Sequence, residues 1–307
     1  EAPVIMTQNG RGVVSEHHYL AQIPSAGPYL LPQADVVLAV GTRFLTQATQ
    51  LAQAGAKPTV IHLDIDDAEI GRNQPTDIRI VGDSRAVLPA LVHETARFNH
   101  VRPSRQEELQ TLQEATHAEL QADEHRAPLA MAVRAALPEE GLVVADMTQV
   151  GYWSRAAFPV YEPRTLIGPG YQGTLGFGYC TALGAKVGRP DRPVVCMAGD
   201  GGFMYTVGEL STAVRHGINV VAVVFNDSAF GNVRRIQTYR FNNRTIASDL
   251  VNPDFVQLAE SFGMLGLRAN NPAELQQHLT TALAANAPAL IEVPVPAMPP
   301  FAALGGG

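Results

Sequence analysis

Several residue types and patterns are scarce in this chain of 307 residues. Charged residues make up 17% against 46% hydrophobic residues, whereas a disordered chain needs low hydrophobicity and high net charge. The longest apolar run, around residues 220–225, is far shorter than the roughly 20 residues that cross a bilayer. The formal net charge is −7, so the basic face of a nucleic-acid binder is not expected. We therefore expect a globular protein that engages neither membranes nor nucleic acids.

Cysteine is almost absent, since Cys180 and Cys196 are the only two. Both lie in apolar segments, so we expect buried free thiols and no disulfide framework. The first residues, Glu1-Ala2-Pro3, have neither the basic start nor the apolar stretch of a signal peptide. These features predict a reducing, cytoplasmic location. Motifs with metal-ligand spacing, such as His-Glu-x-x-His and Cys-x-x-Cys, are missing as well.

Strand-like and helix-like segments alternate along the chain, which predicts an α/β fold. The length fits two domains, and we expect two doubly wound parallel-sheet domains. The first, residues 1–100, contains β-branched runs at 34–41 and 58–66 that predict buried strands. The second, residues 127–307, alternates in the same way and ends in an irregular Pro- and Gly-rich tail.

The segment between these domains, residues 101–126, is polar and rich in Gln and Glu. Leu109, Leu112 and Leu120 are spaced along one face of a helix. We interpret the segment as a linker helix, with a lid helix as the alternative. The preceding residues 84–98 also carry apolar residues at helical spacing and predict a helix.

One glycine-rich segment, Gly199-Asp200-Gly201-Gly202-Phe203, follows a predicted strand and precedes a helix. Glycines let backbone N–H groups approach a ligand, and a helix N-terminus favours phosphate. A carboxylate beside phosphate makes sense when a hard cation such as Mg²⁺ bridges the two. The next predicted strand, 218–225, runs into Asn226-Asp227, and adjacent parallel strands end at one sheet edge. We expect Asp200 and Asp227 to lie close together there, with a tight turn and a helix cap as the alternative interpretation.

Together the two segments resemble the signature of thiamine diphosphate (ThDP) enzymes, Gly-Asp-Gly followed at a similar distance by Asn-Asn or Asn-Asp. Here 27 residues separate Asp200 from Asp227. The stretch from Gly170 through Tyr171 to Ala185 is similar to the segment before this motif in the acetolactate synthase-like group of the 2-oxo acid decarboxylase superfamily. Residues 1–100 resemble the middle domain of the same enzymes, so the resemblance covers nearly the whole chain.

The resemblance implies a metal site and a support for the cofactor. It places Mg²⁺ on Asp200, Asp227 and the backbone carbonyl of Ala229. Family members more often carry Asn at position 227. Leu175 falls on the position of the bulky apolar residue that props the cofactor in its bent conformation, and ordinary core packing is the alternative for this side chain.

The resemblance also implies the remaining cofactor contacts. Thr148 and Gln149 lie in a loop that faces the diphosphate in the family, and a helix cap is the alternative for Thr148. Asn226 precedes a metal ligand and is expected to order its loop. The other residues expected at the cofactor are Gly173, Gly199, Gly201, Gly202, Phe230 and Gly231.

As to activity, the resemblance implies ThDP- and Mg²⁺-dependent cleavage or formation of C–C bonds in 2-oxo acids, with an aldehyde or ketone as second substrate of a carboligase. One alternative is a 2-oxo acid decarboxylase or aldehyde lyase of the same superfamily, and another is a cofactor-binding fragment without catalysis. A dehydrogenase is disfavoured because the glycines do not follow Gly-x-Gly-x-x-Gly. Ile236 stands where acetolactate synthases usually carry Trp, which puts that assignment in doubt.

The resemblance further implies partners and domains outside these residues. The N-terminal pyrimidine-binding domain, which supplies the activating glutamate, is expected to be missing, and Glu209 is interpreted as structural. FAD in the first domain is possible but not favoured: Asp64 and Asp66 either face an adenosine or cap a strand, and we favour the cap. Active sites shared between subunits imply a homodimer or homotetramer. Arg234-Arg235 either meet an acidic substrate or form a solvated helix face.

Overall fold

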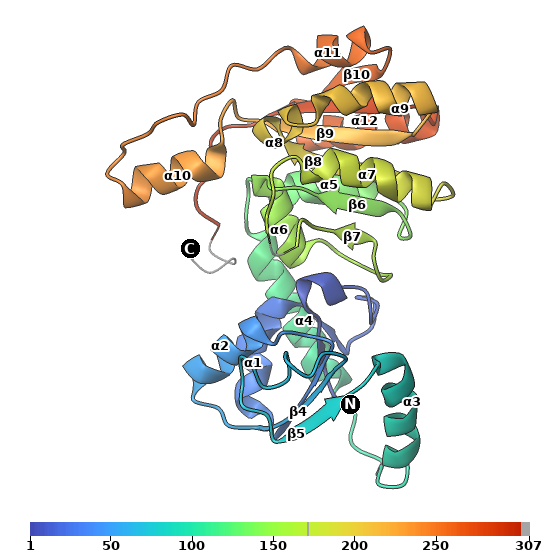
Figure 1. Cartoon of the computed structure of the whole chain (residues 1–307), viewed down its shortest axis with the longest axis vertical. Coiled ribbons are helices and arrows are strands. Elements are labelled where there is room, and N and C mark those ends of the chain that lie inside the picture. Colours follow the sequence, from blue (N-terminus) through green and yellow to red (C-terminus); the bar gives the residue numbers. More distant parts are fainter. Residues whose placement is uncertain (171, 302–307) are drawn as a thin grey trace.

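The computed structural model describes residues 1–170 and 172–301, in two α/β parts joined along the long axis of the molecule (Figure 1). Tyr171 and the terminal glycines Gly305–Gly307 lie outside the described residues. The paired strands of all three described sheets run parallel, so the predicted fold class is confirmed. The predicted domain boundaries, 1–100, 101–126 and 127–307, stay a prediction.

The N-terminal part, residues 1–98, holds a two-stranded sheet and a three-stranded sheet of order β3-β4-β5. Its strands are β1 (Val4–Ile5), β2 (Ala21–Gln22), β3 (Val36–Val40), β4 (Thr59–Asp64) and β5 (Ile78–Val81). Its helices are α1 (Gly27–Leu30), α2 (Leu45–Ala54) and α3 (Ser84–Thr95), with the 3-10 turns η1 (Gln8–Gly10), η2 (Pro24–Ala26) and η3 (Leu31–Gln33).

The prediction of buried strands holds for β4, in which Val60 and Leu63 are 1% and 0% exposed, and is wrong for β3. Ala39 packs with Leu51 of α2 on one face, whereas Val36 and Leu38, on the other face of β3, are 50% and 43% exposed. Ile78 at the far strand is 48% exposed as well. Helix α3 forms as predicted, yet none of its residues is buried. The apolar pattern therefore identified β3 and α3, but it did not predict that part of this face of the sheet is exposed.

Helix α4 (Gln106–Gln121) lies between the two parts (Figure 1). Leu109 is buried against Leu30 of the N-terminal part. At its other end, the carbonyl of Leu120 accepts a hydrogen bond of 2.8 Å from Nε1 of Trp153 in the C-terminal part. The leucines that predicted this helix therefore contact both parts: Leu109 packs on the N-terminal part and Leu120 on the C-terminal part.

The C-terminal part, residues 127–301, is built on a six-stranded sheet of order β10-β11-β9-β8-β6-β7. Its strands are β6 (Leu142–Ala145), β7 (Leu166–Ile167), β8 (Val194–Gly199), β9 (Val220–Asn226), β10 (Leu265–Arg268) and β11 (Ala289–Pro294). Its helices are α5 (Ala127–Ala136), α6 (Gln149–Ala157), α7 (Phe177–Gly188), α8 (Asp200–Met204), α9 (Leu210–His216), α10 (Gly231–Arg240), α11 (Phe255–Ser261) and α12 (Pro272–Ala285), with the 3-10 turn η4 (Val207–Glu209).

Hydrophobic cores cover both faces of this sheet, so its central strands are buried as predicted. Cys196 in β8 is buried, but the prediction of a buried thiol is wrong for Cys180, which is exposed. Cys180 follows Tyr179 on α7, and because Tyr179 faces the core at 1% exposure, the next residue along the helix points elsewhere. The tail after β11 is irregular over its described residues, as predicted.

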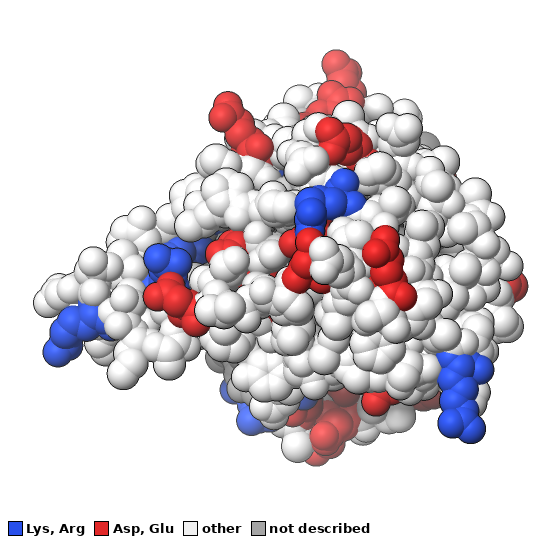
Figure 2. Space-filling model, turned by 90° about the horizontal axis from the view of Figure 1, so that it is seen from above, with Lys and Arg blue, Asp and Glu red and all other residues white. Residues whose placement is uncertain are grey.

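Charged side chains on the face seen from above are scattered, with wide uncharged areas between acidic and basic groups (Figure 2). None of the helices in the described part of the chain is both long and apolar enough to cross a membrane.

Candidate functional site

Two loops meet at the carboxyl edge of the six-stranded sheet. Strands β8 and β9 pair in parallel with Gly199 opposite Phe225, so Asp200 and Asp227 begin neighbouring loops, as the sequence predicts. Helix α8 starts at Asp200 itself, with Gly199 as its N-cap, and not beyond the glycines. The glycine segment is therefore the first turn of the helix, where backbone N–H groups lack partners within the helix.

The two carboxylates perturb each other. Burial raises the pKa of Asp200, which is 2% exposed. Burial, together with the negative charge of Asp200, raises the pKa of Asp227 to about 6. Two acidic groups this close favour a shared proton or a cation between them. The donor set, two carboxylates in a polar loop, fits Mg²⁺.

The glycines around these carboxylates leave room that side chains would fill. A methyl group on Gly201 would lie 2.6 Å from Cε1 of Phe230, and one on Gly231 would lie 2.4 Å from Oδ2 of Asp227. Gly202 has only ordinary contacts at that position, the nearest at 3.6 Å. Gly201 and Gly231 are therefore required by close packing, and Gly202 is not.

Asn252 joins the two loops and was not identified from the sequence. Its Nδ2 donates to Oδ2 of Asp200 at 2.6 Å and to Oδ1 of Asn226 at 2.9 Å. Asn226 in turn donates to Glu292 at 2.8 Å, which agrees with the expectation that it orders its loop. Nothing local marks Asn252, because it follows an irregular segment and precedes a proline.

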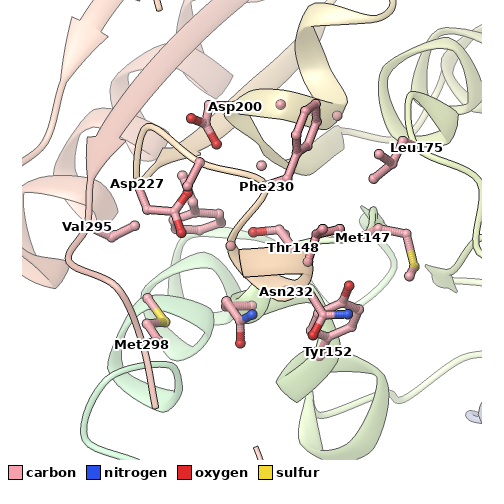
Figure 3. Close-up of a pocket in the computed structure, with 18 of the residues that line it drawn as sticks. Met147, Thr148, Tyr152, Leu175, Asp200, Asp227, Phe230, Asn232, Val295 and Met298 are labelled. Carbon is pink, nitrogen blue, oxygen red and sulfur yellow. The ribbon is translucent and has the colours of Figure 1, made fainter. Parts of the chain in front are cut away.

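A pocket brings the candidate residues together (Figure 3). Every predicted site residue except Asn226 lines it, and Asp200 and Asp227 lie across the pocket from Leu175. Leu175 is 36% exposed, so ordinary core packing does not describe its side chain. Residues of the wall that the sequence did not single out are Met147, Tyr152, Phe225, Asn232, Val233, Val295, Pro296 and Met298.

The loop before α6 contributes two of the predicted residues. Thr148 occupies the N-cap position of α6, but its side chain makes no capping hydrogen bond. Oε1 of Gln149 accepts from Arg126 at 2.9 Å and from Arg235 at 3.5 Å. Asp146, just before them, is buried and accepts from the backbone N–H of Gly178 at 2.9 Å. Burial raises the pKa of the Asp146 carboxyl. Asp146 does not line the pocket, so its hydrogen bonds hold the loop in place.

Other residues considered from the sequence have local partners. The side chain of Asp64 accepts from the backbone N–H of Asp66, and that of Asp66 accepts from the N–H of Ala68, so both carboxylates cap a turn. Arg234 forms an exposed ion pair with Asp249 at 3.1 Å. Glu209 accepts from the Thr212 hydroxyl at 2.7 Å.

No cluster of three or more His, Cys, Asp or Glu side chains that could hold a metal ion occurs within residues 1–170 and 172–301. A cation at the sheet edge would thus depend on two carboxylates completed by a backbone carbonyl, phosphate oxygens or water.

Comparison with known families identifies both parts of the chain. Residues 146–293 match the thiamine pyrophosphate enzyme C-terminal TPP binding domain, and residues 1–91 match the thiamine pyrophosphate enzyme central domain. The two matches lie on either side of α4, and the first of them includes all the predicted site residues.

Similar curated proteins are acetolactate synthases. The chain is 32% identical to acetolactate synthase of Bacillus subtilis (strain 168), over 96% of this chain and 54% of that protein. It is 33% identical to acetolactate synthase isozyme 3 large subunit of Escherichia coli (strain K12), over 92% and 52%. It is 29% identical to a probable acetolactate synthase large subunit of Methanococcus aeolicus, over 94% and 53%. The chain spans about half the length of the curated relatives it matches.

Proposed function

The chain belongs to the thiamine pyrophosphate enzymes, and from this premise we propose that it takes part in ThDP- and Mg²⁺-dependent carboligation of 2-oxo acids, as an acetolactate synthase-like enzyme. The observation that carries the proposal is the pair Asp200 and Asp227, one buried and one half-buried carboxylate at the edge of a glycine-lined pocket. Their mutual repulsion leaves a place for a divalent cation, and the first turn of α8 offers free N–H groups to phosphate.

Each part of the pocket has a role in this proposal. Asp200, Asp227 and the carbonyl of Ala229 would hold Mg²⁺, while Gln149 and the N–H groups after Gly199 would bind the diphosphate. Leu175, which lines the pocket and is 36% exposed, would support the cofactor. When bound, ThDP supplies the electron sink that breaking a bond next to a carbonyl requires. The apolar wall of Phe225, Val295 and Met298 excludes water from the reacting atoms.

A second candidate is a 2-oxo acid decarboxylase or aldehyde lyase of the same superfamily. Ile236 on α10 favours it, because acetolactate synthases usually carry Trp at this position, where it shapes the substrate pocket. The two candidates differ in the step after loss of CO₂: protonation gives an aldehyde, and addition to a second carbonyl gives a 2-hydroxy-2-alkyl acid or an acyloin.

Turnover in this proposal needs an activating glutamate from a pyrimidine-binding domain, in a homodimer or homotetramer whose subunits meet at the ThDP site. The span of the chain, about half that of its relatives, supports the need for a further domain. FAD is not part of the proposal, because Asp64 and Asp66, the residues considered for it, already cap a turn.

Calorimetric titration with ThDP, with and without Mg²⁺, tests the binding site, and a pyruvate assay that separates acetaldehyde from acetolactate tests the reaction. We expect Mg²⁺-dependent binding that Asp200→Ala abolishes. Binding without turnover would identify a cofactor-binding fragment, and acetaldehyde as the main product would select the decarboxylase. Binding unaffected by Mg²⁺ and by Asp200→Ala would overturn the proposed site.

A further inference from the structure

Arg126 is a buried cation that the proposed function leaves without a role. It lies between α4 and α5 and is 1% exposed. Its Nη1 forms an ion pair with Oδ2 of Asp123 at 2.8 Å, and its Nη2 donates to Oε1 of Gln149 at 2.9 Å. The same Nη2 donates to the backbone carbonyl of Pro299, and the guanidinium lies over the ring of Phe301, 5.5 Å from its centre. One side chain thus joins the linker region, the pocket loop and the C-terminal segment.

The contact with Gln149 decides which way its amide points. A guanidinium can only donate, so the atom of Gln149 that faces Arg126 must be the carbonyl oxygen. Arg235 approaches the same oxygen at 3.5 Å. Because Gln149 lines the pocket, its amide nitrogen is left as the group that can donate to a ligand there. Two cations on one oxygen also polarise the amide and strengthen its N–H donors.

The contact with Pro299 holds a different wall. Val295, Pro296 and Met298 line the pocket, yet they follow β11 and belong to no strand or helix. The backbone N–H of Val295 donates to the carbonyl of Asn226, and beyond it the segment depends on side-chain contacts for its position. Arg126 supplies these at the end of the described chain, through the carbonyl of Pro299 and the ring of Phe301.

We propose that Arg126 is a positioning residue that aims the Gln149 amide N–H into the pocket and fastens residues 295–301 as one of its walls. The ligand of that N–H rests on the proposed function: it is an oxygen of the ThDP diphosphate. The contact with the C-terminal segment exists without any ligand, so it can be tested separately.

A double-mutant cycle tests the action through Gln149. Calorimetry measures ThDP affinity in Mg²⁺ for the unchanged chain, Arg126→Met, Gln149→Met and the double variant, and Arg189→Met is the control at an exposed ion pair. Loss of a charge-assisted hydrogen bond weakens binding about tenfold or more, so we expect that loss for both single variants. If Arg126 acts in part through Gln149, the loss in the double variant is smaller than the sum of the two single losses. Strictly additive losses would overturn the proposal.

Chymotrypsin cleavage after Phe301, followed by mass spectrometry without ligand, tests the wall. We expect cleavage about tenfold faster in Arg126→Met, because the guanidinium no longer holds the segment, and an unchanged rate in Gln149→Met and Arg189→Met. Equal rates in Arg126→Met and the unchanged chain would overturn this half.

Two further results separate the possible failures. If the unchanged chain does not bind ThDP, the proposed function fails, while the cleavage rates still test the hold of Arg126 on the segment. If Arg126→Met does not fold, Arg126→Lys replaces it, since a single ammonium keeps the charge but loses the planar fork. We expect Arg126→Lys to fold and to show both defects, and wild-type values for both would overturn the proposal.

Discussion

Asp227 lies beside Asp200 at the ends of two adjacent parallel strands, and the charge of Asp200 helps to raise the pKa of Asp227 to about 6. This pair costs stability in the metal-free protein, because two carboxylates that repel each other are partly withdrawn from water. The same strain is what a divalent cation would relieve.

We therefore expect Asp227→Asn to stabilise the metal-free chain at neutral pH, by roughly 1 kcal/mol after screening by solvent. The folded pKa of about 6 exceeds the unfolded 3.8, so the folded state holds the proton longer and loses stability as the pH rises through that window. The gain should vanish as the pH falls from 6 to 3.8. Urea unfolding in EDTA measures it, with Asp191→Asn as control, since a neighbouring arginine lowers the pKa of Asp191. A loss of stability at neutral pH in Asp227→Asn would contradict the repulsion.

Gly201→Ala should block the pocket at the diphosphate end. Its methyl group would meet the ring of Phe230 at 2.6 Å and push it toward the cofactor, so we expect ThDP affinity to fall about tenfold or more. Gly208→Ala is the matched control, because no atom lies within 4 Å of the added methyl group. Calorimetry of both variants measures the difference in ThDP affinity. Equal affinities would mean that the ring of Phe230 moves away from the methyl group without disturbing the cofactor site.

Asn252→Ala removes the amide that joins Asp200 to Asn226. A lost hydrogen bond to a buried carboxylate is worth about 1.5–3 kcal/mol, so Mg²⁺ affinity should fall by roughly tenfold or more as the two loops separate. Titration of Mg²⁺ into the ThDP-saturated chain measures this effect. Asn270→Ala, at an exposed amide that donates to Glu274, is the control that should leave Mg²⁺ affinity unchanged.

Leu175→Ala distinguishes a support for the cofactor from a core residue. Because the side chain is 36% exposed, the free energy of unfolding should fall by less than about 1 kcal/mol. Leu183→Ala, at 6% exposure in the core on the helix that follows, should cost about 2–5 kcal/mol. Cofactor-dependent activity, measured with the pyrimidine-binding domain present, should be lost in Leu175→Ala only. A large loss of stability in Leu175→Ala would show that Leu175 acts as a core residue and not as a support for the cofactor.

His117→Asn should protect the chain against acid. Burial, with the charge of Arg11, lowers the pKa of His117 to about 4, although Glu16 lies 3.6 Å away. The unfolded state therefore binds a proton that the folded state refuses between pH 6.5 and 4, and stability falls as the pH drops through that window. We expect the unchanged chain to lose up to about 3 kcal/mol more than the variant over this range. Parallel acid-induced unfolding curves would show that His117 does not titrate in this way.

The carboxylate pair could be predicted from sequence because two consecutive strand-loop units place their ends at one sheet edge. The sequence shows directly that Asp200 follows β8 and that Asp227 follows β9. Because the two strands pair in parallel, both residues then lie at the same edge of the sheet. Asn252 and Arg126 could not be found in the same way. Asn252 lies 52 residues from its partner Asp200, and Arg126 lies 173 residues from its partner Pro299, and no local pattern encodes such contacts.

The fold shows the same division. The long apolar run of β9 was predicted closely, whereas β5 and β10 were missed because each has four residues with an arginine among them. Burial was harder to predict than element type. The apolar face of β3 has the composition of a buried strand, but the elements that cover a strand depend on the rest of the molecule.

The order of strands in the larger sheet bears on how the protein is made. Strand β11 is the last regular element among the described residues, yet it is inserted between β9 and β10. A nascent chain that ends before Ala289 leaves both of those strands with an open edge, so the sheet closes only once this late segment has been synthesised. The pocket wall at Val295 comes directly after it, and the carbonyl of Asn226 accepts the backbone N–H of that residue. Closure of the sheet and completion of the cofactor pocket therefore depend on the same late segment of the chain.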